Sequence, residues 1–253
     1  MSALVLRSTA LSHVGHIREV NEDSFLERPD LGLWAIADGM GGHEFGEHAS
    51  RLITARLGEL PAPPDAPTLA RSVQAALGRC HDELRRFAGP DRICGSTVVA
   101  LLVFDGHFAG LWVGDSRLYR LRAGRLEQLS RDHSLVQELI ERGELSEDAA
   151  RRHPLRHQMT RAVGVGDRLE VGVVQDRLAA GDLYLLCSDG LTGELEDAEI
   201  EATLRAAAPE AAAEDLLARA LASEARDNLT LILVRCEQQG PEPGSTLPRG
   251  SPG

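Results

Sequence analysis

The sequence predicts an α+β fold, in which helices are segregated from strands that hairpins connect. Between residues 97 and 129, short apolar segments alternate with two-residue turns. Such short connections join antiparallel strands, because parallel pairing would need a long crossover. Outside this region, apolar side chains recur at helical spacing. A layered domain of sheets and helices is therefore expected, and a doubly wound sheet is not.

The N-terminal elements follow from local patterns. A strand pair is expected within residues 4–25 and another strand over the apolar run 31–37. A helix is expected over 45–60, and the proline-rich segment 61–67 ends it. Thr68 is then expected to cap a second helix that extends to Phe87.

The remaining elements begin with one antiparallel meander. Residues 132–166 interrupt the strands with a short helix near 135–140 and a loop rich in His and Arg, a pattern typical of a surface insertion. From residue 237 the chain is rich in Pro, Gly and Ser without apolar periodicity, so the folded domain is expected over 1–236 and a disordered tail over 237–253. The expected strands are 97–104, 107–113, 117–122, 126–129, 169–174, 183–188 and 229–236, and the last helices are 200–207 and 209–222.

Composition and charge exclude several classes of protein. The formal net charge is −12, and no cluster of basic residues is concentrated enough to suggest nucleic-acid binding. The four cysteines are widely spaced, so reduced, mostly buried thiols are expected rather than a zinc site. The N-terminus has no secretory pattern, and the longest apolar run, 98–104, is too short to cross a bilayer. We expect a soluble, cytoplasmic protein without membrane insertion.

Aspartates that begin or end strand-like segments are the strongest functional signal. Carboxylates that converge repel one another unless cations neutralise them, and oxygen ligands without a Cys or His pattern suit Mg²⁺ or Mn²⁺. Two such ions can convert a shared water into a nucleophile that attacks phosphorus, and Arg18 is the type of side chain that binds phosphate. Each residue alone has a structural alternative: Asp-Gly is a common turn, and Arg18 can pair with Glu22. The aspartates are Asp38, Asp115, Asp189 and Asp227, and Glu22-Asp23 adds a fifth acidic segment.

Seven motifs, in this order, resemble those of the bacterial metal-dependent protein serine/threonine phosphatases of type 2C, the PPM family. The resemblance covers about residues 8–235. The motifs are Gly15-x-x-Arg18-x-x-Asn21-Glu22-Asp23, Asp38-Gly39-Met40-Gly41-Gly42-His43, Gly95-Ser96-Thr97, Val113-Gly114-Asp115-Ser116-Arg117, Asp132-His133-Ser134, Ser188-Asp189-Gly190 and Asp227-Asn228-Leu229-Thr230.

The resemblance implies a four-layer αββα sandwich, two antiparallel sheets flanked by helices, with two Mn²⁺ or Mg²⁺ ions at one end. By analogy Asp38 bridges both ions, Asp189 and Asp227 bind the first, and the Gly39 carbonyl binds the second. Glu22 is similar to the residue that acts through a metal-bound water. Residues 133–165 correspond to the flap beside the active site of the family.

The same resemblance implies catalytic roles. Asp23 is similar to the residue that orients the nucleophilic water, and Arg18 to the phosphate-binding arginine. Asp115, with Asp189, resembles a third, weaker metal site, although Gly193 stands where many relatives carry an acid for that site. Met40 replaces the histidine of eukaryotic relatives, so His43 becomes the candidate general acid. The structural alternative for His43 is a loop histidine packed against Glu47 or against the glycine-rich turn.

The implied function is hydrolysis of phosphoserine and phosphothreonine in proteins by a monomer, a signal-transduction role that opposes a bacterial Ser/Thr kinase. One alternative is a catalytically silent scaffold that binds a phosphorylated partner. Another keeps the chemistry and changes the substrate, to a phosphorylated metabolite or a phosphorylated domain of a sigma-factor switch. A basic strip in the flap is either a solvated surface or a device that steers acidic substrates. It comprises Arg151, Arg152, His153, Arg156, His157 and Arg161.

Overall fold

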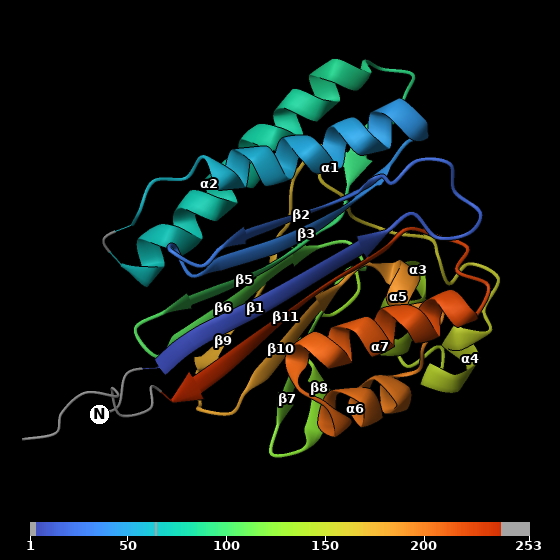
Figure 1. Cartoon of the computed structure of the whole chain (residues 1–253). Helices are drawn as coiled ribbons and strands as arrows, with labels where there is room; N and C mark the ends of the chain where they lie inside the picture. The colour runs from blue at the N-terminus through green and yellow to red at the C-terminus, as the bar shows by residue number, and fades with distance from the viewer. Residues whose placement is uncertain (1–3, 64, 239–253) are drawn as a thin grey trace, which may run out of the picture.

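The strands form two antiparallel sheets that pack face to face in a computed structural model, which describes residues 4–63 and 65–238 (Figure 1). The first sheet has the order β1-β11-β10-β7-β8, and the second has the order β2-β3-β5-β6-β9, with β4 paired to the end of β3. In the first sheet the strands are β1 (Leu4–His13), β11 (Leu229–Gln238), β10 (Leu183–Cys187), β7 (Arg117–Arg122) and β8 (Arg125–Gln128). In the second they are β2 (Asp23–Arg28), β3 (Leu33–Met40), β4 (Gly95–Ser96), β5 (Val98–Phe104), β6 (His107–Val113) and β9 (Gly172–Arg177).

Helices cover the outer face of each sheet. Helices α1 (His43–Gly58) and α2 (Ala66–Ala88) lie on the second sheet, whereas α6 (Asp197–Ala206) and α7 (Pro209–Ala222) lie on the first (Figure 1). The short helices α3 (Leu135–Glu141), α4 (Glu147–Arg151) and α5 (Asp189–Thr192) lie towards the right-hand end of the view. The expected α+β class and its four-layer αββα arrangement are therefore confirmed.

Alternation along each strand creates three buried layers. In β3, Leu33, Ala35 and Ala37 face the helices, whereas Trp34 and Ile36 face the other sheet. The same period of two applies to β11, where Leu231 packs under α7 and Ile232 packs between the sheets. Both faces of these strands are buried, which explains why they are continuous apolar runs rather than alternating ones.

Two expectations about strand pairing were wrong. The strands expected as a pair within residues 4–25 belong to different sheets, because β1 pairs with β11 and β2 pairs with β3. The expected meander is also divided, because the chain crosses from one sheet to the other between β6 and β7. At this crossing Gly114 has φ 101°, and a Cβ there would lie 2.7 Å from Thr97 Cγ2. The crossing therefore needs a glycine in the left-handed region, tightly packed against the neighbouring strand.

Several element boundaries also differ from those expected. Asp65, not Thr68, caps α2, and its Oδ1 accepts a hydrogen bond from Thr68 N at 2.7 Å. Strand β9 begins at Gly172 rather than at residue 169. Strand β11 continues two residues past Cys236, where Gln238 is the register partner of Leu4. The rest of the expected tail, 239–253, lies outside the described residues. Within 4–63 and 65–238, the structure contains no helix long and apolar enough to cross a membrane.

Candidate metal centre

Two of the acidic residues are brought together by strand register. Asp23 begins β2 and Asp38 lies near the end of β3, and the two are direct partners in the ladder between these strands. The backbone of β3 is fixed at this point by its neighbour, since Thr97 N donates to Asp38 O at 2.8 Å and Asp38 N donates to Thr97 Oγ1 at 3.2 Å. Antiparallel partners place their side chains on the same face of a sheet, so the two carboxylates are neighbours.

The other sheet supplies the remaining aspartates at the same end of the sandwich. Asp189 follows β10 and begins α5, and Asp227 lies just before β11. Asp115 lies in the crossing between β6 and β7. The strands that carry Asp189 and Asp227 are joined beyond their ladder by Ser188 N, which donates to Thr230 O at 3.0 Å. Residues from five separate segments thus meet where the two sheets end.

Proximity of these carboxylates opposes their ionisation. Burial, followed by the charges of Asp23 and Asp189, raises the pKa of Asp38 well above its ordinary value. Burial, followed by the charge of Asp189, does the same to the pKa of Asp115. The pKa of Asp189 is raised by burial and then by Asp227. A cluster of this kind stores electrostatic repulsion that a divalent cation would remove.

Asp23 is the most deeply buried member, with 8% of its surface exposed. Burial raises the pKa of this carboxyl to about 7, although hydrogen bonds from Thr230 and Ser188 act in the opposite direction. Ser188 Oγ donates to Asp23 Oδ2 at 2.8 Å, while Asp23 Oδ1 is buried without a hydrogen-bond partner. A buried acceptor without a hydrogen-bond partner lowers the stability of the fold. Asp23 Oδ1 is therefore suited to accept a hydrogen bond from a water molecule.

Arg18 lies beside the cluster and contacts one of its members. Arg18 Nη2 donates to Asp227 Oδ2 at 2.7 Å, and this hydrogen bond raises the pKa of Arg18 further. Both side chains remain accessible, with 54% of Arg18 and 40% of Asp227 exposed. Arg18 thus pairs with Asp227, and the charge of Glu22, the partner in the structural alternative, also raises the pKa of Arg18. Arg18 therefore presents its remaining N–H donors at an open surface.

The start of α1 packs closely against the end of β3, and this contact determines where Gly39 and the Glu22 carboxylate lie. A Cβ on Gly39 would lie 2.1 Å from Gly46 O, so the start of α1 packs directly against the end of β3. A Cβ on Gly46 would lie 1.9 Å from Glu22 Oε2. The two glycines therefore leave room for the Glu22 carboxylate next to the helix and keep the Gly39 backbone beside it.

Asn228 follows Asp227 in one of the sequence motifs, and the structure shows what its side chain does. It is 4% exposed, and its Oδ1 accepts a hydrogen bond from Glu22 N at 2.8 Å. Its Nδ2 donates to Val14 O at 2.9 Å and to Val20 O at 3.1 Å. This side chain joins the segment of Arg18 and Glu22 to the strand of Asp227. The only signal in the sequence is that a polar residue adjoins an aspartate at a strand end.

The other predicted residues lie in α1, at the end of α5 and in the flap segment. His43 begins α1, close to Gly39, but its side chain is not among those that the structure describes. Gly193 closes α5, where its N–H donates to Asp189 O at 2.7 Å. In the flap segment, Arg161 pairs with Glu170 at 3.2 Å. The exposed His157 lies near enough to Asp189 to oppose, in part, the rise in the pKa of Asp189. Arg152 and Arg156 are exposed, and the side chain of Arg151 is not described.

The chemistry of the cluster fits hard divalent cations. Its donors are carboxylate and carbonyl oxygens, the ligands that Mg²⁺ and Mn²⁺ prefer. In the described part of the chain, no group of three or more His, Cys, Asp or Glu side chains is arranged to hold an ion as it stands. Two contacts already involve these carboxylates: Arg18 donates a hydrogen bond to Asp227, and a hydrogen bond joins Asp38 to Asp189.

Comparisons with known proteins point to one family. The profile of the family Protein phosphatase 2C matches residues 14–233. The serine/threonine protein phosphatase PstP of Mycobacterium tuberculosis is 36% identical over 234 residues, which is 91% of this chain and 45% of PstP. The chain thus spans about half the length of this curated relative.

Two solved structures have the same fold. PppA, a key regulatory component of T6SS in Pseudomonas aeruginosa, superimposes with a TM-score of 0.85 at 40% identity, over 92% of this chain and 98% of PppA. The catalytic domain of PstP in complex with two manganese ions has a TM-score of 0.80 at 33% identity, over 93% of this chain and all of that domain.

Proposed function

The chain belongs to the protein phosphatase 2C family, and we propose that it hydrolyses phosphoserine and phosphothreonine in proteins at a centre of two Mn²⁺ or Mg²⁺ ions. The observation that carries the proposal is the convergence of buried carboxylates from both sheets beside an exposed arginine. A relative's structure in complex with two manganese ions supports the number and kind of ion. The open position of Arg18 favours a phosphate carried on a protein surface over a small metabolite enclosed in a pocket.

The family resemblance assigns the ligands. Asp38 would contact both ions, Asp189 and Asp227 the first, and the Gly39 carbonyl the second, while Glu22 would act through a bound water. Asp115 would contribute to a weaker third site with Asp189, whose charge already acts on it. Bound cations would lower the pKa of a shared water and neutralise the negative charge of the phosphate.

The side chains of the chain itself perform the remaining tasks. Asp23 Oδ1, which has no hydrogen-bond partner, would accept a hydrogen bond from the attacking water and orient it. Ser188 holds the other carboxylate oxygen and so fixes the direction of Asp23. Arg18 would exchange Asp227 for the phosphate oxygens of the substrate, which suit its planar group of N–H donors. His43, close to Gly39 at the start of α1, is the candidate to protonate the leaving seryl oxygen.

A turnover measurement tests the proposal. Purified chain with Mn²⁺ is expected to release inorganic phosphate from phosphoserine and phosphothreonine peptides, and EDTA is expected to stop the release. Asp38→Asn is expected to lower kcat at least 100-fold, since it removes a charge from the ligand proposed to contact both ions. Equal phosphate release by wild type and Asp38→Asn would refute the proposal. A purified chain that binds two ions without any turnover would instead support the scaffold alternative.

The partners of the proposed reaction are phosphorylated proteins, made by a Ser/Thr kinase whose action this chain would reverse. We propose that the chain acts as a monomer. Comparing kcat/KM for phosphopeptides with that for sugar phosphates would test the substrate class. A higher value for sugar phosphates would refute a protein substrate while leaving the metal chemistry intact.

A further inference from the structure

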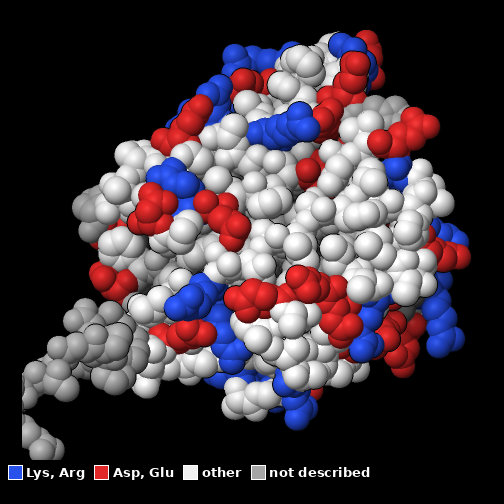
Figure 2. Space-filling model, in the orientation of Figure 1, with Lys and Arg blue, Asp and Glu red and all other residues white. Residues whose placement is uncertain are grey.

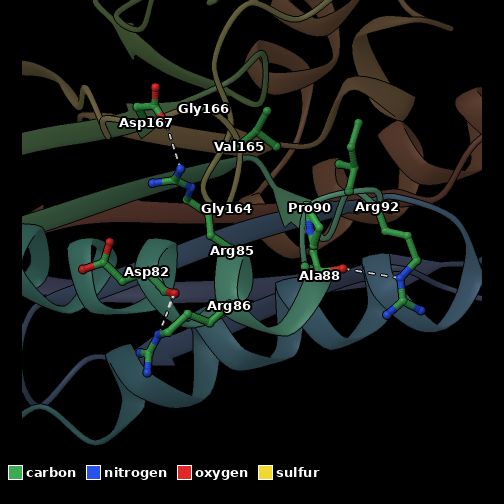
Figure 3. A pocket seen from close by; sticks show the side chains of 12 residues that line it. Asp82, Arg85, Arg86, Ala88, Pro90, Arg92, Gly164, Val165, Gly166 and Asp167 are labelled. Carbon is green, nitrogen blue, oxygen red and sulfur yellow. Dashed lines mark hydrogen bonds and ion pairs between the residues drawn. The ribbon is translucent and has the colours of Figure 1, made fainter.

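A groove lies beside the candidate metal centre and has no part in the chemistry described above. It has a volume of about 830 Å³ and runs between the C-terminal turn of α2 and residues 164–167, where the flap segment ends (Figure 3). One lining residue, Ile93, packs against the segment that follows β3, because a Cβ on Gly41 would lie 2.2 Å from Ile93 O. Two residues further on, Gly95 pairs with Met40 of β3. The groove therefore opens next to the strand that carries Asp38.

Two arginines of the groove, Arg86 and Arg92, form no ion pair among the described residues, although the carboxylate of Asp82 also lines the groove. Arg86 Nε donates to Asp82 O at 3.0 Å, and Arg92 Nε donates to Ala88 O at 3.3 Å (Figure 3). A guanidinium has five N–H donors, and these bonds use one from each. The remaining donors of Arg86 and Arg92 are free to bind carboxylates.

A third arginine of the groove, Arg85, is paired with a readily displaced partner. Its Nη2 lies 2.7 Å from Asp167 Oδ1, and the Asp167 side chain is 94% exposed. Exposed ion pairs of this kind contribute little to stability, so another carboxylate could replace Asp167 at small cost. The net charge of the chain is −12, and Figure 2 shows basic and acidic side chains interspersed over the visible face. Arginines without a bound carboxylate are therefore a local feature of this groove, not part of a general positive field.

Two large apolar side chains are exposed near the C-terminal end of α2. Ile93, which lines the groove, is 51% exposed, and Phe87, in the last turn of α2, is 52% exposed. The Phe87 ring lies 4.4 Å from that of His48 and 5.8 Å from that of Phe45. The guanidinium of Arg92 lies 4.8 Å from the centre of the Phe45 ring, a cation–π contact that holds this arginine at the rim. The surface thus combines cationic groups with exposed apolar area, as protein-binding sites commonly do.

We propose that this groove docks an acidic segment of the phosphoprotein substrate, with carboxylates on Arg86 and Arg92 and an apolar side chain against Ile93. The inference rests on the proposed function, because it places the groove next to the residue that is dephosphorylated. Gly41 is three residues from Asp38, at most about 10 Å along the chain. A substrate in extended conformation, at about 3.3 Å per residue, would reach the groove roughly four to six residues from its phosphoserine.

Paired phosphopeptides test the docking. Both carry the same phosphoserine core, and one has Glu at positions four to six on each side where the other has Gln. Wild type is expected to show a KM about fivefold lower for the Glu peptide, since exposed charge contacts each have a modest effect. The variant Arg86→Glu/Arg92→Glu is expected to lose this preference. Arg71→Glu/Arg125→Glu, which makes the same charge change at exposed positions outside the groove, is expected to keep it.

Two further measurements separate docking from chemistry. All variants are expected to hydrolyse p-nitrophenyl phosphate with unchanged kcat/KM. This substrate is too small to contact the groove while its phosphate lies at the metal centre. Fluorescence anisotropy with a labelled, non-phosphorylated Glu peptide reports binding without turnover, and Arg86→Glu/Arg92→Glu is expected to weaken it. No preference in wild type, or an equal loss in both double variants, would overturn the docking proposal. Failure to hydrolyse p-nitrophenyl phosphate with Mn²⁺ would instead overturn the proposed function, while the anisotropy result still decides the docking.

Discussion

Asp23 and Asp38 lie directly opposite each other in the ladder between β2 and β3. This pairing places two carboxylates side by side at a position surrounded by protein, where like charges directly opposite are destabilising. Burial, with the charge of Asp23 as the next cause, raises the pKa of Asp38. The register that builds the candidate metal centre therefore also weakens the fold in the absence of cations.

The first prediction concerns this repulsion. Mn²⁺ at about 100 times its Kd is expected to stabilise the chain by about 2.7 kcal/mol. At about 2–4 °C per kcal/mol for a chain of this size, Tm is expected to rise by roughly 5–10 °C. Asp38→Asn is expected to raise Tm in EDTA, because it removes one of the opposed charges, and to abolish the Mn²⁺-dependent rise. Thermal unfolding with EDTA or Mn²⁺ measures both effects, and an undiminished Mn²⁺ shift in the variant would contradict the assignment.

The second prediction concerns Asn228, which joins three backbone segments around the cluster. Asn228→Ala leaves Glu22 N, Val14 O and Val20 O without their side-chain partner. We expect a loss of about 2–4 kcal/mol in the free energy of unfolding, since each buried unsatisfied group costs about 1–3 kcal/mol. Mn²⁺ affinity is expected to fall as well, because the segments of Glu22 and Asp227 are no longer held together. Urea unfolding and calorimetric Mn²⁺ titration measure these changes.

A matched control separates the Asn228 network from general damage. Asn21 also makes side-chain hydrogen bonds near the cluster, in which Nδ2 donates to Ser12 Oγ at 2.9 Å and Oδ1 accepts from Asp23 N at 3.1 Å. Asn21→Ala removes these more local contacts and is expected to cost less stability than Asn228→Ala. If both variants lose the same stability and Mn²⁺ affinity, Asn228 has no special role in joining the segments.

Local patterns in the sequence were sufficient for the elements that end at the cluster. The apolar run 31–37 followed by Asp-Gly predicted a buried strand that delivers Asp38, and β3 covers Leu33–Met40. The apolar periodicity of 209–222 predicted α7, which covers Pro209–Ala222. These succeeded because burial of one strand or one helix face is encoded within a few residues. The sequence motifs also identified the family correctly.

Pairing between distant strands could not be predicted in the same way. Leu4 pairs with Gln238 across almost the whole chain, and no local pattern carries that information. The crossing at Gly114 has the same short, polar composition as a hairpin turn, so the sequence pattern predicts a hairpin there. The role of Asn228 was missed for a related reason, because its partners Val14, Val20 and Glu22 are about 200 residues away. Long-range contacts decide both the topology and the support of the candidate site.

The third prediction uses two helical glycines with different surroundings. A Cβ on Gly46 would lie 1.9 Å from Glu22 Oε2, whereas a Cβ on Gly78 would meet nothing within 4 Å. Gly78→Ala is expected to stabilise the chain by about 0.5–1 kcal/mol, the usual gain for alanine in a helix, without changing activity. Gly46→Ala must displace the Glu22 carboxylate and is expected to lower kcat/KM at least tenfold. Phosphopeptide turnover and urea unfolding distinguish the two, and full activity of Gly46→Ala would argue against a role for Glu22.

The fourth prediction is a pH dependence at Asp182, which lies just before the first residue of β10, at the opposite end of that strand from Asp189. The Asp182 side chain is 1% exposed and accepts hydrogen bonds from Arg122 Nε and Nη2, both at 2.7 Å. Burial alone would raise the pKa of Asp182, but hydrogen bonds from Arg122 and Ala179 N outweigh it, and the pKa lies below its ordinary value. A carboxyl with a lowered folded-state pKa stabilises the fold fully above its unfolded pKa, about 3.9, and loses that contribution as pH falls through the folded value.

Asp182→Asn is therefore expected to destabilise the chain at pH 7 by about 2–4 kcal/mol, since it breaks a largely buried charge pair and leaves Arg122 without its partner. Between about pH 5 and pH 3, wild type is expected to lose stability more steeply than the variant, so that the difference between them narrows. Urea unfolding at a series of pH values, with EDTA present throughout, measures that difference without a contribution from metal binding. Asp30→Asn provides the control, because Asp30 forms an exposed pair with Arg28 and its removal is expected to change stability little at any pH. A gap between wild type and Asp182→Asn that stays constant down to pH 3 would show that Asp182 acts through its hydrogen bonds and shape rather than through its charge.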